Sequence, residues 1–215
     1  MGRNRFNLAS KHGNNNSPRI ALSEDRLYGH AMDSQSLVGH LLVASPALAD
    51  TPFAQTVVLV MQQDEKDTFG IVLNRPANHQ VADQLKQITG APLADDLALI
   101  HGGPLNGPVF AIHQSEELAE VLIPGGICVS AELDTLRQLE HQFQPYRIVL
   151  GMVGWKTAEL LEQIHTGQWL TLSSASPDQI FADPEWMWQR AVLEYGRHTM
   201  SWVTGFPMQG YPELN

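Results

Sequence analysis

The chain has 215 residues, of which 43% are hydrophobic and 17% are charged, and its formal net charge at pH 7 is −10. A chain of this length and apolar content buries a sizeable core, so it is not disordered over most of its length and needs no disulfide or metal for stability. Residues 37–215 hold eight basic and twenty acidic side chains, and this balance argues against direct DNA binding by the core, because affinity for phosphate backbones comes largely from Lys and Arg.

Residues 1–36 show neither the alternation of a strand nor the period of a helix, and they include a stretch rich in Gly, Asn, Ser and Pro over residues 12–18. We expect a flexible N-terminal arm with a net charge of +2, from five basic and three acidic side chains. The arm either serves an acidic partner or is an unstructured leader, and we favour the leader because the charge excess is small. Translation from Met32 is a third explanation.

The chain contains a single cysteine, Cys128, so it cannot form an intramolecular disulfide, and no paired Cys/His spacing typical of zinc sites occurs. The longest nearly apolar run, residues 148–155, is much shorter than the roughly 20 residues that a membrane helix needs. The N-terminus lacks the apolar segment of a secretory signal. We therefore expect a cytoplasmic protein.

The first half of the core is rich in strand signals. Residues 41–44, 56–61 and 69–73 are short apolar runs bounded by Pro, Gly or polar clusters, and the loop between the last two is short enough for an antiparallel hairpin. Helical spacing of apolar residues predicts a short helix over residues 81–89. Further strands are expected over residues 97–100, 109–113 and 127–130.

The second half alternates helices and strands. Ser130 can cap a helix that reaches about Gln142, and the most apolar strand, residues 147–153, is expected in the centre of its sheet. A helix over residues 157–165 and a strand over 169–172 follow. Two helix starts come next, a capping box at residues 176–179 and Asp183-Pro184-Glu185, and Gly196 is expected to end the latter helix. The prediction is a single α+β domain over residues 37–203 with a mixed sheet, followed by a C-terminal tail over 204–215.

Two motifs at strand ends are candidate ligand-binding elements. In Asn74-Arg75-Pro76, Arg75 could bind a carboxylate or phosphate with two parallel hydrogen bonds, or it could pair with an acidic side chain of the core, which we favour. In His101-Gly102-Gly103-Pro104, the glycine N–H groups could bind an anion, although a tight chain reversal explains the same residues more simply.

Other motifs favour structural roles. Residues 151–157 end in Lys-Thr but lack the spacing of a phosphate-binding loop, so we expect Trp155 to anchor the core. Cys128 lies in an apolar strand, and a nucleophilic Cys–His pair would need His40, His101 or His113 beside it. Trp186 and Trp188 point to different faces of the last helix, so one of them is expected to be exposed for a partner and the other to join the core.

The order and spacing of several motifs from about residue 37 to 195 resemble the YqgE/AlgH family of bacterial proteins. The motifs are residues 39–46, Phe53 with residues 56–59, residues 70–76, Gly102-Gly103-Pro104 and Gly154-Trp155. The resemblance implies an α+β fold whose sheet bends into a pseudo-barrel with flanking helices. It also implies no established enzyme activity and a family label of transcriptional regulators.

We therefore expect a non-enzymatic regulatory or binding protein that acts through a protein partner or a small anionic ligand. The candidate ligand-binding residues are Asn74, Arg75, His101, Gly102 and Gly103. No catalytic residue, metal site or cofactor is expected. The alternative is a thiol-dependent enzyme or a hydrolase that uses Cys128 with a histidine.

Overall fold

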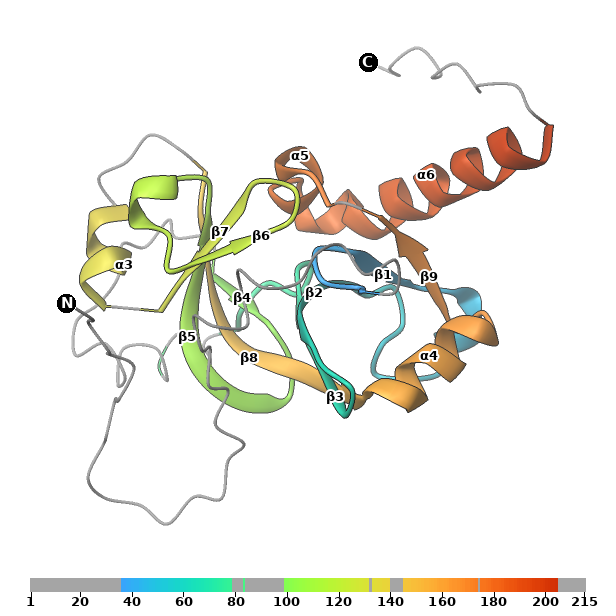
Figure 1. Ribbon diagram of the computed structural model, residues 1–215, viewed down its shortest axis with the longest axis horizontal. Coiled ribbons are helices and arrows are strands. Elements are labelled where there is room, and N and C mark those ends of the chain that lie inside the picture. The colour runs from blue at the N-terminus through green and yellow to red at the C-terminus, as the bar shows by residue number, and fades with distance from the viewer. Residues whose placement is uncertain are drawn as a thin grey trace. The chain divides into compact units, whose positions relative to one another are not determined.

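The computed structural model describes residues 36–78, 83, 99–131, 133–139, 145–173 and 175–204, and Figure 1 shows how their helices and strands are arranged. From Leu37 onward these residues belong to one compact unit. The helix predicted over residues 81–89 lies outside the described residues except for Asp83. So do the predicted N-terminal arm, apart from Ser36, and the predicted tail, apart from Thr204.

The described strands form one nine-stranded sheet in the order β6-β7-β5-β8-β3-β2-β1-β9, and β4 pairs with β8 off this path. All pairs of described strands are antiparallel except β4 and β8, which run parallel. The strands are β1 (Leu41–Ala44), β2 (Val57–Gln63), β3 (Asp67–Val72), β4 (Leu99–His101), β5 (Leu105–His113), β6 (Val121–Ile123), β7 (Ile127–Ser130), β8 (Arg147–Lys156) and β9 (Trp169–Leu172). The sheet curls into a half-barrel with helices at its margins (Figure 1), which confirms the predicted fold class.

Strand β8 lies in the centre of the sheet, as its apolar sequence predicts. It pairs with β3, β4 and β5, and all its residues are buried except Gly154 and Lys156. Strand β6 was not predicted. It is only three residues long, and its one outward side chain, Leu122, is apolar as well, so no alternation separates it from a loop.

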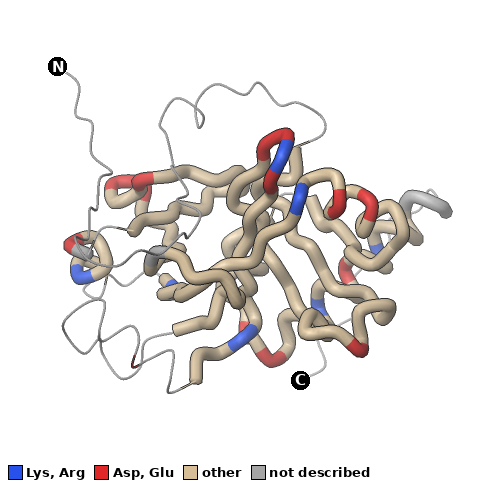
Figure 2. Tube along the Cα trace, turned by 90° about the horizontal axis from the view of Figure 1, so that it is seen from below, with Lys and Arg blue, Asp and Glu red and all other residues tan. Residues whose placement is uncertain are grey.

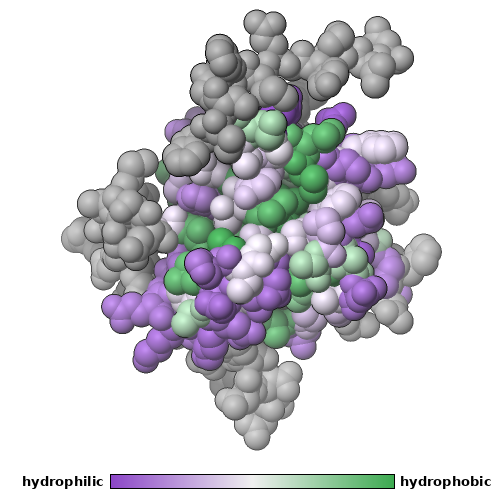
Figure 3. Space-filling model, turned by 90° about the vertical axis from the view of Figure 1, so that its right-hand side faces the viewer, coloured by the Kyte–Doolittle hydropathy of each residue, from purple (hydrophilic) through white to green (hydrophobic). Residues whose placement is uncertain are grey.

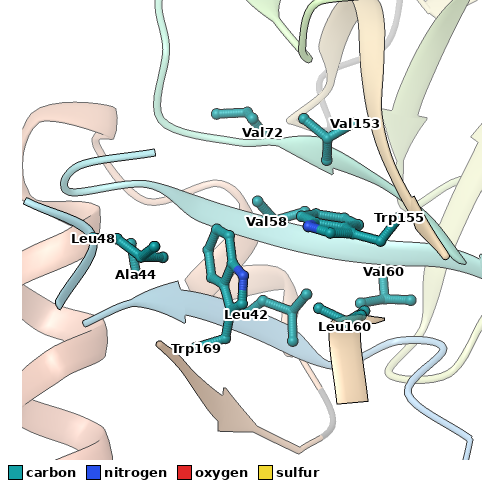
Figure 4. Packing of buried hydrophobic residues seen from close by; sticks show 10 residues of the cluster. All are labelled: Leu42, Ala44, Leu48, Val58, Val60, Val72, Val153, Trp155, Leu160 and Trp169. Atoms are coloured by element: carbon teal, nitrogen blue, oxygen red, sulfur yellow. The ribbon is translucent and has the colours of Figure 1, made fainter. Parts of the chain in front are cut away.

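One part of the core surrounds two tryptophans, Trp155 of β8 and Trp169 of β9 (Figure 4). The side chains packed around them come from β1, β2, β3, β8, η1 (Pro46–Leu48) and α4 (Thr157–His165), and they are Leu42, Ala44, Leu48, Val58, Val60, Val72, Val153 and Leu160. The rings of Trp155 and Trp169 meet edge to face, with centroids 5.7 Å apart. We call this group the tryptophan cluster, and it confirms the role predicted for Trp155.

Several helix starts confirm local signals in the sequence. Helix α4 begins and ends as expected, and α5 (Pro177–Ile180) has a complete capping box in which Ser176 and Gln179 exchange hydrogen bonds. The remaining helices are η2 (Glu116–Leu118), α3 (Leu133–Leu139) and α6 (Pro184–Thr204).

Helix α6 does not end at Gly196, as the sequence predicts, but continues to Thr204. Gly196 is not among the glycines with positive φ, so it does not form the left-handed cap that ends many helices. An exposed helical glycine costs only about 1 kcal/mol relative to alanine, and residues 197–204 contain no Gly or Pro. The helix therefore extends two turns past Gly196.

Charged residues lie mostly in loops and at the ends of elements, whereas the strands that cross the middle of the molecule carry few of them (Figure 2). Arg147, the first residue of β8, is an exception, since it is only 5% exposed. Its guanidinium donates hydrogen bonds to Leu73 O, at 3.0 Å, and to Ala182 O. Burial lowers the pKa of Arg147, and the nearby Asp183 carboxylate opposes that shift. Arg147 thus ties the end of β3 to the segment before α6.

Candidate functional site

The Asn74-Arg75-Pro76 turn follows β3 and lies against the loop of residues 51–56. Asn74 Oδ1 accepts a hydrogen bond from Val57 N–H at 2.9 Å, and Asn74 Nδ2 donates one to Gln55 O at 2.7 Å. Gln55 has a φ of +54°, a left-handed conformation that few side chains favour. Asn74 therefore holds this strained loop in place, a role that its sequence neighbours do not reveal.

Arg75 reaches the same loop through one nitrogen of its guanidinium. Nη2 donates to Ala54 O at 2.8 Å, to Thr56 Oγ1 at 3.2 Å and to Pro52 O at 3.3 Å. The Arg75 side chain is exposed, and the described residues include no carboxylate within ion-pair distance of it. The prediction that Arg75 pairs with an acidic side chain is therefore wrong among the described residues. Backbone carbonyl groups and the Thr56 hydroxyl accept its hydrogen bonds instead.

His101 is the last residue of β4 and lies beside Arg75. Its backbone N–H donates to Arg75 O at 2.8 Å, and Pro76 forms an isolated bridge with Ile100. The His101 side chain is exposed. The structure thus brings together Asn74, Arg75 and His101, which are 27 residues apart at most, at one end of β3 and β4.

Gly102 and Gly103 follow β4 and lie against β8, where they permit a close approach of the two backbones. The N–H of Gly102 donates to Leu150 O at 2.8 Å, and a Cβ on Gly102 would lie 2.3 Å from Gly151 O. Gly103 has a φ of +147°, and a Cβ there would lie 2.3 Å from Met152 O. The Gly102 N–H is therefore already used within the fold. Neither glycine is therefore part of the anion site that we propose at Arg75 and His101.

A buried polar group lies between β5 and β7. His113 Nε2 lies 3.0 Å from Ser130 Oγ, and His113 Nδ1 accepts a hydrogen bond from Ser115 N–H at 3.2 Å. Since Nδ1 accepts, the ring proton lies on Nε2 and is donated to Ser130, whose hydroxyl donates to Leu118 O at 2.6 Å. The prediction that Ser130 caps the next helix is therefore wrong, because its hydroxyl belongs to this buried network.

The hydrogen bond between His113 and Ser130 runs in the wrong direction for nucleophilic catalysis. A catalytic histidine accepts the proton of the hydroxyl, whereas His113 donates its own, and both side chains are at most 1% exposed. Burial lowers the pKa of His113, so the ring stays neutral at physiological pH.

Cys128 lies directly opposite His113 in the sheet, which is the neighbour that the thiol-enzyme alternative requires. The cysteine is buried, and burial raises the pKa of its thiol, with a further rise from the Glu116 carboxylate. Both ring nitrogens of His113 are already bonded to other groups. The thiol therefore has neither the exposure nor the base that activates a cysteine nucleophile.

We expect Cys128 of the native protein to react with a disulfide reagent such as DTNB at least about 100-fold more slowly than the denatured chain, because the folded thiol is protonated and covered. A raised folded-state pKa also means that deprotonation favours opening, so labelling should speed up as the pH rises. Stopped-flow absorbance measures both. Fast stoichiometric labelling at pH 7 that His113→Ala abolishes would instead support the thiol-enzyme alternative.

The described residues contain no cluster of three or more His, Cys, Asp or Glu side chains that could hold a metal ion. Within the same residues, no helix is long and apolar enough to cross a membrane.

The chain belongs to the AlgH-like family (DUF179), whose model matches residues 41–200. A UPF0301 protein from Streptomyces avermitilis is 33% identical over 196 residues, which cover 84% of this chain and 96% of that protein. A UPF0301 protein from Xylella fastidiosa is 29% identical over 77% of this chain and 93% of its own length. The family that the motifs resemble is thereby confirmed, and the names of these relatives state no activity or ligand.

Two solved structures share the fold. The solution structure of AlgH from Pseudomonas aeruginosa has a TM-score of 0.61 and 27% identity, and it covers 81% of this chain and 95% of AlgH. The crystal structure of protein DIP2367 from Corynebacterium diphtheriae also has a TM-score of 0.61, at 22% identity, over 74% of this chain and 87% of that one. The curled sheet is therefore the fold of the family.

Proposed function

We propose that the protein is a non-enzymatic, cytoplasmic binding protein with a regulatory role, and that Arg75 and His101 bind an anionic group of its ligand. The observation that carries the proposal is the way in which Arg75 is held. Three acceptors in residues 52–56 bind Nη2 alone, whereas Nε and Nη1 have no hydrogen-bond partner among the described residues.

A guanidinium held at one nitrogen keeps its remaining N–H groups in a fixed direction. The Nε–H and Nη1–H groups point to opposite sides of the guanidinium, because Nη1 lies on the same side as Cδ, so each can donate a separate charge-assisted hydrogen bond to an oxygen of a phosphate or carboxylate. Pro76 and the Asn74 hydrogen bonds fix the backbone on both sides of Arg75. Because the side-chain entropy is already partly lost in the free protein, the binding of an anion costs less.

His101 adds a second polar group beside Arg75. Its backbone is bonded to Arg75, its side chain is exposed, and an imidazole can donate a hydrogen bond to an anion in either charge state. An acidic protein repels anions in general, so a specific site needs such local donors. The regulatory role rests on the family label, and the cytoplasmic location on the single, unpaired Cys128.

The experiment is an NMR titration of the ¹⁵N-labelled protein with inorganic phosphate, observed at the Arg75 Nε–H and the His101 ring. We expect saturable shifts at both groups, and Arg75→Gln should weaken the binding at least about tenfold because it removes both the charge and the guanidinium donors. Arg137→Gln is the matched control, since Arg137 is exposed and pairs only with Asp134 within its own helix. Non-saturable shifts, or equal affinity in Arg75→Gln, would contradict the proposal.

A further inference from the structure

Helix α6 carries a line of exposed apolar side chains on the face opposite to the core. Trp186, Leu193 and Met200 are 51%, 67% and 49% exposed, and they follow one another at intervals of seven residues. The residues that face the sheet, Met187 and Ala191, are buried instead. We call the three exposed side chains the α6 stripe. It spans roughly 21 Å along the helix, at 1.5 Å per residue.

Within the described part of the chain, the side chains of the α6 stripe keep about half or more of their surface exposed. Beyond Tyr195, every residue up to Met200 is exposed, so this end of the helix stands clear of the sheet. Figure 3 views the molecule from the side toward which α6 extends in Figure 1, and hydrophobic residues are visible there among hydrophilic ones. Aligned apolar side chains of this size in water are typical of interaction surfaces.

The spacing of the stripe fits another helix. A repeat of seven residues keeps side chains in line along a helix that packs at a small angle against a second one. Gly196 lies between Leu193 and Met200, and a Cβ placed there would meet nothing within 4 Å. This open position between two large side chains can receive an apolar side chain from the partner.

The charge beside the stripe defines the chemistry of that partner. Arg190 and Arg197 are exposed, lie next to the stripe at helical spacing, and form no ion pair with any described residue. Two copies of α6 packed antiparallel would bring these arginines together on one side of the pair, which is unfavourable. A helix with carboxylates beside its own apolar side chains would pair with them instead.

We propose that the α6 stripe, with Arg190 and Arg197 beside it, is a docking surface for an acidic amphipathic helix of another protein. This surface is separate from the Arg75 site and does not depend on anion binding there. The two arginines provide a local positive charge although the net charge of the chain is −10, and vesicles distinguish binding to an anionic membrane from binding to a helix.

The probe is a fluorescently labelled, designed 21-residue peptide with Leu at heptad a and d positions and Glu beside them, compared with the same peptide carrying Lys for Glu. Fluorescence anisotropy with the full chain should show saturable binding of the acidic peptide, at least about tenfold tighter than of the basic one. Binding should weaken at least about tenfold in Leu193→Glu and in the double variant Arg190→Glu/Arg197→Glu.

Leu122→Glu is the matched control, since Leu122 is an equally apolar exposed side chain on β6 and should leave peptide binding unchanged. All these positions are exposed, so circular dichroism should show folded variants. Absence of saturable binding, or equal affinity for both peptides, would overturn the proposal. So would self-association in sedimentation velocity, or binding to phosphatidylcholine/phosphatidylglycerol vesicles, that Leu193→Glu abolishes and Leu122→Glu does not.

Discussion

Replacing Trp169 by alanine is expected to lower the free energy of unfolding by about 3–5 kcal/mol, the usual cost of removing a large aromatic side chain from a core. Trp169 is 2% exposed and packs edge to face against Trp155 and Phe53, with ring centroids 5.7 and 5.5 Å apart. Its indole N–H also donates to Gln163 Oε1 at 3.0 Å, which would lose its partner. A cavity in the tryptophan cluster cannot close easily, because rigid strands surround it.

Urea denaturation followed by circular dichroism measures this loss, and Trp186→Ala serves as the control because that side chain is 51% exposed. The control should stay within about 0.5 kcal/mol of the native protein. If Trp169→Ala cost no more than Trp186→Ala, the tryptophan cluster would not be the core described here.

The tryptophan cluster also reaches the candidate site. Phe53, whose ring packs against both tryptophans, lies between Pro52 and Ala54, whose carbonyl groups accept the hydrogen bonds of Arg75. The core therefore holds the loop that orients the guanidinium. Loss of Trp169 should weaken phosphate binding as well as stability, even though Trp169 has no contact with the anion.

Gly102→Ala is expected to cost about 3 kcal/mol, at the upper end of the range for overpacking. The new Cβ would lie 2.3 Å from Gly151 O, and a backbone atom of the central strand cannot move aside as a flexible side chain can. The parallel pair of β4 and β8 would have to separate, and His101 would be displaced from Arg75.

Gly196→Ala is the matched control for the same chemical change. Its Cβ meets no atom within 4 Å, and alanine favours the helix by about 1 kcal/mol, so this variant should be slightly more stable than the native protein. Urea denaturation of both variants measures the difference. Equal stabilities of Gly102→Ala and Gly196→Ala would show that β4 does not pack against β8 as closely as described.

The sequence predicts most strands and helices of the described core because local signals define them. The bounds of β1, α4 and β9 match the prediction, since each is a periodic or continuous apolar run between Gly, Pro or capping residues. The length of α6 was mispredicted because a single glycine in a helix costs less than the remaining helix-forming residues gain.

The candidate site was predictable in its members but not in their contacts. The Asn74-Arg75-Pro76 motif identifies the turn. The acceptors of Arg75, however, are backbone carbonyl groups about twenty residues earlier, and a backbone acceptor cannot be predicted from residue types. The network of His113, Ser130 and Leu118 O was missed for a similar reason, because it depends on strand register and not on sequence spacing.

Chemical denaturation of Arg75→Lys, measured together with its phosphate titration, tests most directly whether Arg75 serves recognition. Lysine keeps the charge and can still donate to Ala54 O, but it lacks the planar guanidinium whose Nε and Nη1 donate away from the loop. We expect the free energy of unfolding to stay within about 1 kcal/mol of the native value while phosphate affinity falls severalfold. A loss of about 3 kcal/mol or more with unchanged phosphate affinity would instead show that Arg75 serves the fold alone.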